Sequence, residues 1–227
     1  MPDLRTVLTT LRFGDAQHHR SMAMFPLIHP DPQPAFYLTL DDALARRLVR
    51  ITETSPGGSV PELRVVNTAD RPVLLLDGEE LVGTKQNRTL NLTILVPPKS
   101  ELVVPVTCVE RGRWRHSAAE VSSPSLHYAE ARARKMAAVS ASLRSHQTPV
   151  ADQGEVWRGI DAKMARMGSS SPTAAMEDIY RQHARDLEGY LASFAACPGQ
   201  CGAVFALGGV VRGAEVFDSP ETLRKIG

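Results

Sequence analysis

The sequence predicts an α+β protein with a mainly antiparallel β-sandwich or open barrel, a helical insertion or layer, and a late β-hairpin that rejoins the sheet. Three observations support this fold class. Short apolar runs separated by turn residues fill the first half of the chain, apolar residues recur at helical spacing in the second half, and two apolar runs flank Gly208-Gly209. We expect one domain over residues 1–227, with a β-rich part at 1–116, a helical part at 125–195, and a closing hairpin and helix start at 203–227.

The bulk composition excludes several classes of protein. Of the 227 residues, 43% are hydrophobic and 22% are charged, which is typical of a folded globular chain and excludes wholesale disorder. A net charge of +1 provides no overall attraction for nucleic acid or for an anionic membrane. No apolar run approaches the roughly 20 residues that span a bilayer, and the start lacks a secretory signal pattern. We therefore expect a cytoplasmic protein without membrane contact, whose three cysteines are thiols.

The N-terminal segment predicts strands, a loop and a short helix. Apolar stretches between Leu4 and Leu27 are typical of one or two strands. Prolines then alternate through residues 30–34, where a helix is excluded and a sheet would lose hydrogen-bond donors. Thr39 can cap a helix that continues to Leu48, because the two aspartates that follow it suit the positive helix start.

The middle of the chain predicts an antiparallel sheet system. The expected strands lie around Leu63 and Val65, at Val73–Leu76, at Thr89–Ile94 and at Leu102–Glu110. Residues 89–94 alternate most clearly between polar and apolar, as a half-buried strand does. Asp77-Gly78 predicts a two-residue hairpin, because both positions tolerate a positive φ.

The last third of the chain predicts helices followed by a hairpin. Met136, Val139 and Leu143 recur at helical spacing, and a looser amphipathic piece surrounds Trp157. Ser171-Pro172 predicts the start of a long helix whose apolar face continues to Phe194. Strands at 203–207 and 210–217 then enclose a tight turn, and a capped helix at Ser219-Pro220-Glu221 stops after less than two turns, as a truncated or frayed helix would.

Ionic and amide residues concentrate in the segment Asp77–Arg88. Three carboxylates, two cations and two amides lie within these twelve residues, between strongly apolar strands. In a strand Glu79 and Glu80 point to opposite faces, so at least one is expected to face inward. A buried carboxylate either pairs with a cation, here Lys85, Arg88 or Arg113, or has its pKa raised. The alternative is a hairpin with a solvated salt-bridge face, which is the commoner role of acidic hairpins.

These residues carry a resemblance to a known bacterial family. The segments concerned are Leu74–Arg88, Leu95–Pro98 and Pro105–Trp114, with further similarity at Phe25–Leu27, Tyr37–Leu40, Gly57–Glu62, Asp152–Trp157 and Gly208–Asp218. Together they resemble the ADP-ribosylglycohydrolase and rhodanese-phosphatase-superfamily-associated protein domain, formerly a domain of unknown function. The resemblance covers nearly the whole chain. The family name records gene association, so it implies a role beside enzymes that process ADP-ribose or phosphate groups.

The resemblance implies a set of site residues. Those carried over by position are Glu79, Glu80, Lys85, Gln86, Asn87, Arg88, Cys108, Glu110, Arg113, Trp114, Gln153 and Trp157. Thr84 stands where the family pattern has a small alanine. An anionic, ribose-bearing ligand would suit these groups: arginine forks for phosphate, amides for hydroxyls or a base edge, and Trp114 for stacking. If both face one cavity, Glu80 and Glu110 are the candidate catalytic residues, as general acid or base or as groups that orient a water.

Two functions of different class follow from this site. The first is an enzyme that recognises or processes an ADP-ribose-like or nucleotide-derived group. The second is a non-catalytic binding module or scaffold for a nucleotide, a nucleic acid or a partner protein. The sequence indicates neither a cofactor nor the oligomeric state.

Several weaker signals favour structural roles. Cys108 is expected to be a buried inert thiol in preference to a nucleophile, and Cys197 and Cys201 lack the second pair that makes a zinc site convincing. His116 and His127 flank the polar segment, where a lone histidine is more often structural than catalytic. The basic helix face of Arg132, Arg134, Lys135 and Arg144 is expected to be solvated, with nucleic-acid contact as the less favoured alternative.

Overall fold

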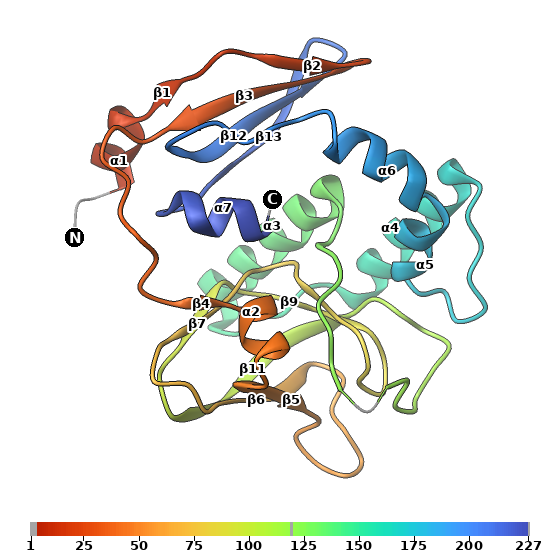
Figure 1. Cartoon of the computed structure of the whole chain (residues 1–227). Coiled ribbons are helices and arrows are strands. Elements are labelled where there is room, and N and C mark those ends of the chain that lie inside the picture. The colour runs from red at the N-terminus through yellow and green to blue at the C-terminus, as the bar shows by residue number, and fades with distance from the viewer. Residues whose placement is uncertain (1–3, 119, 227) are drawn as a thin grey trace. The chain divides into compact units, whose positions relative to one another are not determined.

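The structure is a computed structural model that describes residues 4–118 and 120–226 (Figure 1). The chain divides into two compact units. The first combines the segment up to Phe36 with the segment from Ala184 onward, and the second is Tyr37–His183. The α+β class with mainly antiparallel sheets is confirmed, whereas the assignment of the chain to one domain stays a prediction.

The described part of the chain contains helices and short strands in the order given below. The helices are Leu4–Thr10 (α1), Leu40–Ala45 (α2), Ala129–His146 (α3), Gln153–Met167 (α4), Glu177–Gln182 (α5), Ala184–Leu191 (α6) and Pro220–Ile226 (α7). The strands are Arg12–Phe13 (β1), Gln17–His19 (β2), Met22–Ile28 (β3), Leu38–Thr39 (β4), Val49–Thr52 (β5), Glu62–Asn67 (β6), Val73–Leu75 (β7), Glu80–Leu81 (β8), Arg88–Leu90 (β9), Ile94–Val96 (β10), Ser100–Cys108 (β11), Gln200–Leu207 (β12) and Val210–Val216 (β13). Among these helices none has the length and apolar character needed to cross a membrane.

The first unit joins the two ends of the chain in one sheet. Its strand order is β1-β3-β12-β13, and β2 also pairs with β3. The late hairpin is confirmed: Gly208 and Gly209 both have positive φ (60° and 78°), which a two-residue turn of this kind requires. The hairpin joins the sheet through β3, from the N-terminal segment. The predicted final helix is α7, whose start is capped by Ser219 Oγ accepting from the Glu221 N–H.

One expectation for the first unit is wrong in part. Residues 4–10 form α1, whereas the apolar stretches between Leu4 and Leu27 predict one or two strands and no helix. Val7, Leu8 and Leu11 are as compatible with a helix as with a strand. The hydroxyls of Thr9 and Thr10 donate to carbonyls three residues earlier, which satisfies backbone acceptors at the end of this short helix.

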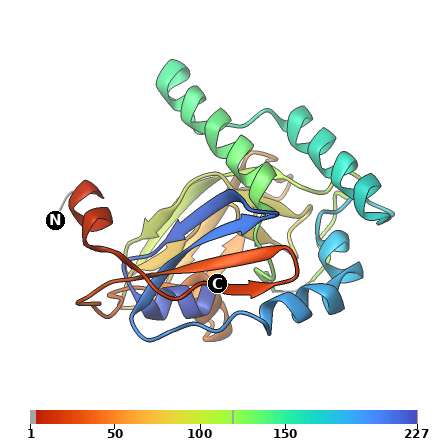
Figure 2. The same ribbon diagram turned by 90° about the horizontal axis from the view of Figure 1, so that it is seen from above.

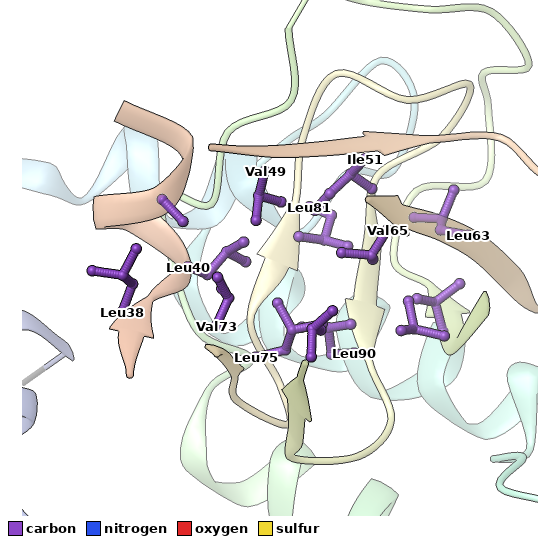
Figure 3. Close-up of a cluster of buried hydrophobic side chains, with 14 of the residues drawn as sticks. Leu38, Leu40, Val49, Ile51, Leu63, Val65, Val73, Leu75, Leu81 and Leu90 are labelled. Atoms are coloured by element: carbon purple, nitrogen blue, oxygen red, sulfur yellow. The ribbon is translucent and has the colours of Figure 1, made fainter. Parts of the chain in front are cut away.

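The second unit contains two sheets and its own apolar core. One sheet has the order β10-β7-β4 and the other β5-β6-β11-β9-β8. Figure 3 shows side chains from both sheets and from α2 meeting in one cluster, which includes Leu40, Leu63, Leu75 and Leu90. Thr39 caps α2 by accepting from the Asp42 N–H, as predicted, but the helix ends at Ala45 and not at Leu48.

Two strand predictions for the second unit are corrected. Residues 89–94 do not form one half-buried strand, because the chain leaves β9 at Asn91 and enters β10 in the other sheet. The Asn91 amide donates to the Pro149 carbonyl, and its oxygen accepts from Thr107 Oγ1, so the side chain is buried at the crossing. Asp77-Gly78 does form a tight turn, closed by the Glu79 N–H donating to the Leu76 carbonyl. It is not a hairpin, because β7 pairs with β10 and β4, and β8 pairs with β9.

The helical predictions are correct in kind and wrong in two details. Figure 2 shows α3 and α4 as two long helices joined by a loop. The buried residues of α3 are Arg132, Lys135 and Val139, so two of the cations expected to be solvated are in fact covered. The long helix expected from Ser171-Pro172 to Phe194 is split into α5 and α6 at His183, where φ is −109° and the ring contacts Ser169 Oγ.

Candidate functional site

The polar segment is buried and does not form a solvated salt-bridge face. Among its members the side chains of Glu79, Glu80, Asn87 and Arg88 are at most 5% exposed. Burial of this many ionic groups is costly unless they pair with one another. They do so in two neighbouring clusters, one centred on Arg88 and the other on Asn87.

Arg88 lies at the start of β9 and is fully buried. Its hydrogen bonds hold the loop between β5 and β6 in place. Its guanidinium donates to both oxygens of Glu53, at 2.9 and 3.3 Å. Its remaining hydrogen bonds go to backbone carbonyls of the same loop and of Gln86, and to Thr84 Oγ1. The hydroxyl of Thr84, at the position where the family pattern has alanine, is therefore part of this cluster. All five guanidinium N–H groups have partners within the chain.

Lys85 and Trp114 also lie against the β5–β6 loop. Lys85 Nζ donates to the carbonyls of Pro56 and Gly57, at 2.6 and 2.9 Å. Lys85 Nζ and the Arg88 guanidinium each lie 5.6 Å from the ring centroid of Trp114, within cation–π range. Trp114 is 46% exposed, so part of its ring is open to a stacking partner.

Asn87 is the junction of the second cluster. Its side-chain nitrogen donates to Glu80 at 3.3 Å and to Glu177 at 3.2 Å. Its side-chain oxygen accepts from Arg113 at 2.8 Å, and its backbone N–H donates to Glu110 at 3.0 Å. Asn87 thus connects three carboxylates and one guanidinium from three separate parts of the fold: β8, α5 and the segment after β11.

Glu110 is held as a carboxylate. Arg113 donates to its two oxygens at 2.9 and 2.5 Å. Burial acts to raise the pKa of Glu110, but the hydrogen bonds from Arg113 and from the Asn87 N–H outweigh it, so the pKa lies below its ordinary value. The other Arg113 donors bind the carbonyls of Thr84 and Arg115.

The pKa of Glu80 is shifted in the opposite direction, above its ordinary value. It is fully buried on β8, where its partners are the Ser125 hydroxyl at 2.8 Å and the Asn87 amide. Burial raises the pKa of Glu80 to about 7, and the negative charge of Glu177 adds to the shift. Two carboxyl groups tied to the same asparagine therefore favour different protonation states near neutral pH, which is the condition for an acid and base pair.

Glu79 points to the other face of β8, as predicted. It accepts from the Leu76 N–H at 2.8 Å and so closes the Asp77-Gly78 turn with its own side chain. Burial raises the pKa of Glu79 to about 8. The neighbouring Asp77 accepts two hydrogen bonds from Arg132, which explains why that arginine of α3 is buried.

Cys108, Gln153 and Trp157 lie together, where α4 meets the end of β11. Gln153 accepts from the Cys108 N–H at 2.9 Å and donates to the Cys108 carbonyl at 2.7 Å, as a neighbouring strand would. Burial raises the pKa of the Cys108 thiol, which disfavours the thiolate. The Trp157 Nε1–H is buried beside this sulfur without a hydrogen bond of ordinary geometry.

The structure thus brings most of the predicted residues into two adjoining clusters. Lys85, Arg88 and Trp114 belong to the first cluster. The second contains Glu80, Asn87, Glu110 and Arg113, while Gln86 makes a long hydrogen bond of 3.4 Å to the Arg111 carbonyl. Glu79 and the group around Cys108 lie outside both.

Sequence reasoning missed three participants of these clusters. Glu53 comes from the β5–β6 loop, Ser125 from the segment beside β8, and Glu177 from the first turn of α5. No spacing in the sequence links them to residues 77–88. The one available signal was the pair of acidic residues at 177 and 178, which marks a helix start.

Other places in the fold are less suited to chemistry. In the described part of the chain, no group of three or more His, Cys, Asp or Glu side chains is arranged to hold a metal ion. A cleft between α3 and α4 is lined by small residues and by charged ones, of which Glu130 is paired with Arg134 and Arg166. None of the hydrogen-bond partners of Asn87 lines this cleft.

Comparison with known proteins gives one match. A family model described as the ARG and Rhodanese-Phosphatase-superfamily-associated Protein domain matches residues 10–226. Neither the curated proteins nor the solved structures gave a match. The match includes all the residues of both clusters.

Breaking the Arg88–Glu53 pair is expected to destabilise the protein strongly. Arg88→Met leaves the Glu53 carboxylate buried without its cation, so the free energy of unfolding should fall by about 3–5 kcal/mol, measured by urea denaturation. The double variant with Glu53→Gln should recover part of the loss. Arg64→Met, which breaks a half-exposed pair with Glu101, is the control and should cost less than about 1 kcal/mol. Equal small losses for both arginines would contradict the structural role of Arg88.

Stability is expected to depend on pH through Glu79. The folded pKa of about 8 lies above the ordinary value of 4.5, so the folded state binds more protons and stability falls as pH rises between these values. The melting temperature of Glu79→Gln should therefore rise relative to that of the wild type from pH 5 to pH 8. Glu62→Gln, which removes an exposed carboxylate, should follow the wild type. Parallel melting profiles for all three proteins would refute the assignment of a neutral buried Glu79.

Proposed function

Since the chain belongs to the family of ARG and Rhodanese-Phosphatase-superfamily-associated Protein domains, we propose that it recognises and processes an ADP-ribose-like or other nucleotide-derived group at the Asn87 cluster. Glu80 is the proton donor and Glu110 the carboxylate that orients the attacking water or stabilises developing positive charge. The observation that carries this proposal is the Asn87 amide, which holds Glu80 and Glu177 on its nitrogen and Arg113 on its oxygen.

The chemistry follows from the two environments. Glycosidic bonds are cleaved by paired carboxyl groups, of which one donates a proton while the other stays ionised. Glu80, with a pKa of about 7, is partly protonated at neutral pH and can donate. Glu110, with its lowered pKa, keeps its negative charge. The class of substrate rests on the family's gene association with ADP-ribose and phosphate enzymes.

The two arginines have supporting roles in this proposal. Arg113 sets the position and charge of Glu110, and Arg88 holds the β5–β6 loop through Glu53. Their use as phosphate forks, expected from the resemblance, stays a prediction that requires them to exchange internal partners for the ligand. Trp114 remains our candidate for stacking on a base, because its ring is half exposed.

A second candidate is a non-catalytic binding module. It is favoured by one observation, the complete internal pairing of the Arg88 and Arg113 donors, which is typical of a structural network. In that case the same face recognises a nucleotide or a partner protein without turnover.

The cytoplasmic location also stays a prediction.

Ligand binding and turnover separate these functions. We expect ADP-ribose to raise the melting temperature of the wild type, and Glu80→Gln and Glu110→Gln to retain binding but lose at least about 100-fold in the rate of ADP-ribose release or hydrolysis. Glu62→Gln is the matched control for loss of a carboxylate. Binding without turnover, unchanged in both variants, would support the module. No shift with ADP-ribose, ADP or ribose 5-phosphate would contradict the proposed ligand class.

A further inference from the structure

His127 is a buried histidine whose ring packs edge-on against Tyr128, but whose ring nitrogens have no hydrogen-bond partner among the residues that the structure describes. Its side chain is 2% exposed. A buried polar group without a hydrogen bond destabilises the folded state, because it has lost its contact with water and gained no replacement. Burial, with the charges of Lys135 and Arg132, lowers the pKa of His127 to about 3, so the ring is neutral and offers one donor and one acceptor.

The backbone register places His127 on the same face as Glu80. Leu126 forms an isolated antiparallel bridge with Glu79, the residue that precedes β8. The Glu80 N–H donates to the Ser125 carbonyl at 2.8 Å, and the His127 N–H donates to the Gly78 carbonyl at 2.7 Å. Because side chains alternate along a strand, His127 and Ser125 project to the face that carries Glu80. The hydrogen bond from Ser125 Oγ to Glu80 places Ser125 on that face, and the alternation of side chains extends the assignment to His127, two residues later.

Thr89 extends this face on the next strand. It lies directly opposite Glu80 in the β8–β9 pair and opposite Thr107 in the β9–β11 pair. Thr89 is fully buried, and its hydroxyl is also without a partner in the described structure. Thr107, by contrast, donates to the Asn91 oxygen at 2.6 Å. Three unpaired polar atoms, two on His127 and one on Thr89, therefore share a face with the proposed acid.

We infer that this face of β8 and β9 binds hydroxyl groups, with His127 and Thr89 as additional ligand-binding residues beside Glu80. The inference rests on the proposed function. It narrows the proposed class of ligand to compounds that present hydroxyl groups to this face of β8 and β9. A neutral imidazole and a threonine hydroxyl both donate and accept, which matches the vicinal hydroxyls of a ribose or a bound water. The cations of Lys135 and Arg132 near His127 make this face unsuitable for a positively charged group.

The test uses substitutions that separate binding from stability. His127→Leu removes only unpaired polar atoms, so the melting temperature should stay the same or rise, while the affinity for ADP-ribose measured by calorimetry should fall at least about tenfold. Thr89→Val should behave in the same way. Thr107→Val is the matched control: it breaks an internal hydrogen bond, so it should lower the melting temperature and leave the affinity unchanged.

The outcomes distinguish this inference from the proposed function. A His127→Leu protein that binds ADP-ribose as tightly as the wild type overturns the inference even if Glu80→Gln abolishes turnover. A wild type that does not bind ADP-ribose overturns the proposed ligand. The inference is then judged by a high-resolution crystal structure of the full chain. Ordered water on His127 and Thr89 Oγ1 supports the hydroxyl-binding face, and carbon atoms packed against all three polar atoms overturn it.

Discussion

The candidate site depends on the hydrogen bonds of the Asn87 side-chain amide. Carboxyl groups from β8 and α5 share its nitrogen, and Arg113 binds its oxygen and fixes Glu110. An amide can donate and accept at once and carries no charge, so it connects acidic groups without neutralising them. The unequal environments of Glu80 and Glu110 follow from this arrangement: one lies among neutral donors and another carboxylate, and the other lies against a guanidinium.

The motif residues divide by task. Arg88 binds Glu53 and two backbone carbonyls of the β5–β6 loop, and Gln153 binds both backbone groups of Cys108, so these side chains build the frame. The residues of the family motif therefore include structural side chains as well as candidate ligand contacts. The groups that we propose for chemistry are Glu80 and Glu110, and those that we propose for hydroxyl binding are the His127 and Thr89 atoms without a hydrogen-bond partner among the described residues.

Local features were predictable from the sequence, because short-range rules govern them. Thr39 as a helix cap and Gly208-Gly209 as a hairpin turn are set by residues within one turn. The break of the 89–94 strand depends instead on Asn91 reaching Pro149, and the burial of Arg132 depends on Asp77, more than 50 residues away. The density of ionic residues at 77–88 indicated the site. Its completion by Glu53 and Glu177 required the tertiary fold, since no local periodicity encodes those contacts.

Two carboxyl groups that hydrogen-bond to one asparagine, Glu80 and Glu110, are expected to hold different protonation states near neutral pH. Carbon-detected NMR titration of the glutamate side chains in the full chain, with signals assigned by Glu80→Gln and Glu110→Gln, tests it most directly. We expect Glu80 to titrate with a pKa of about 7 and Glu110 with a pKa below its ordinary value of 4.5. Titration of both groups together near that ordinary value would contradict this expectation.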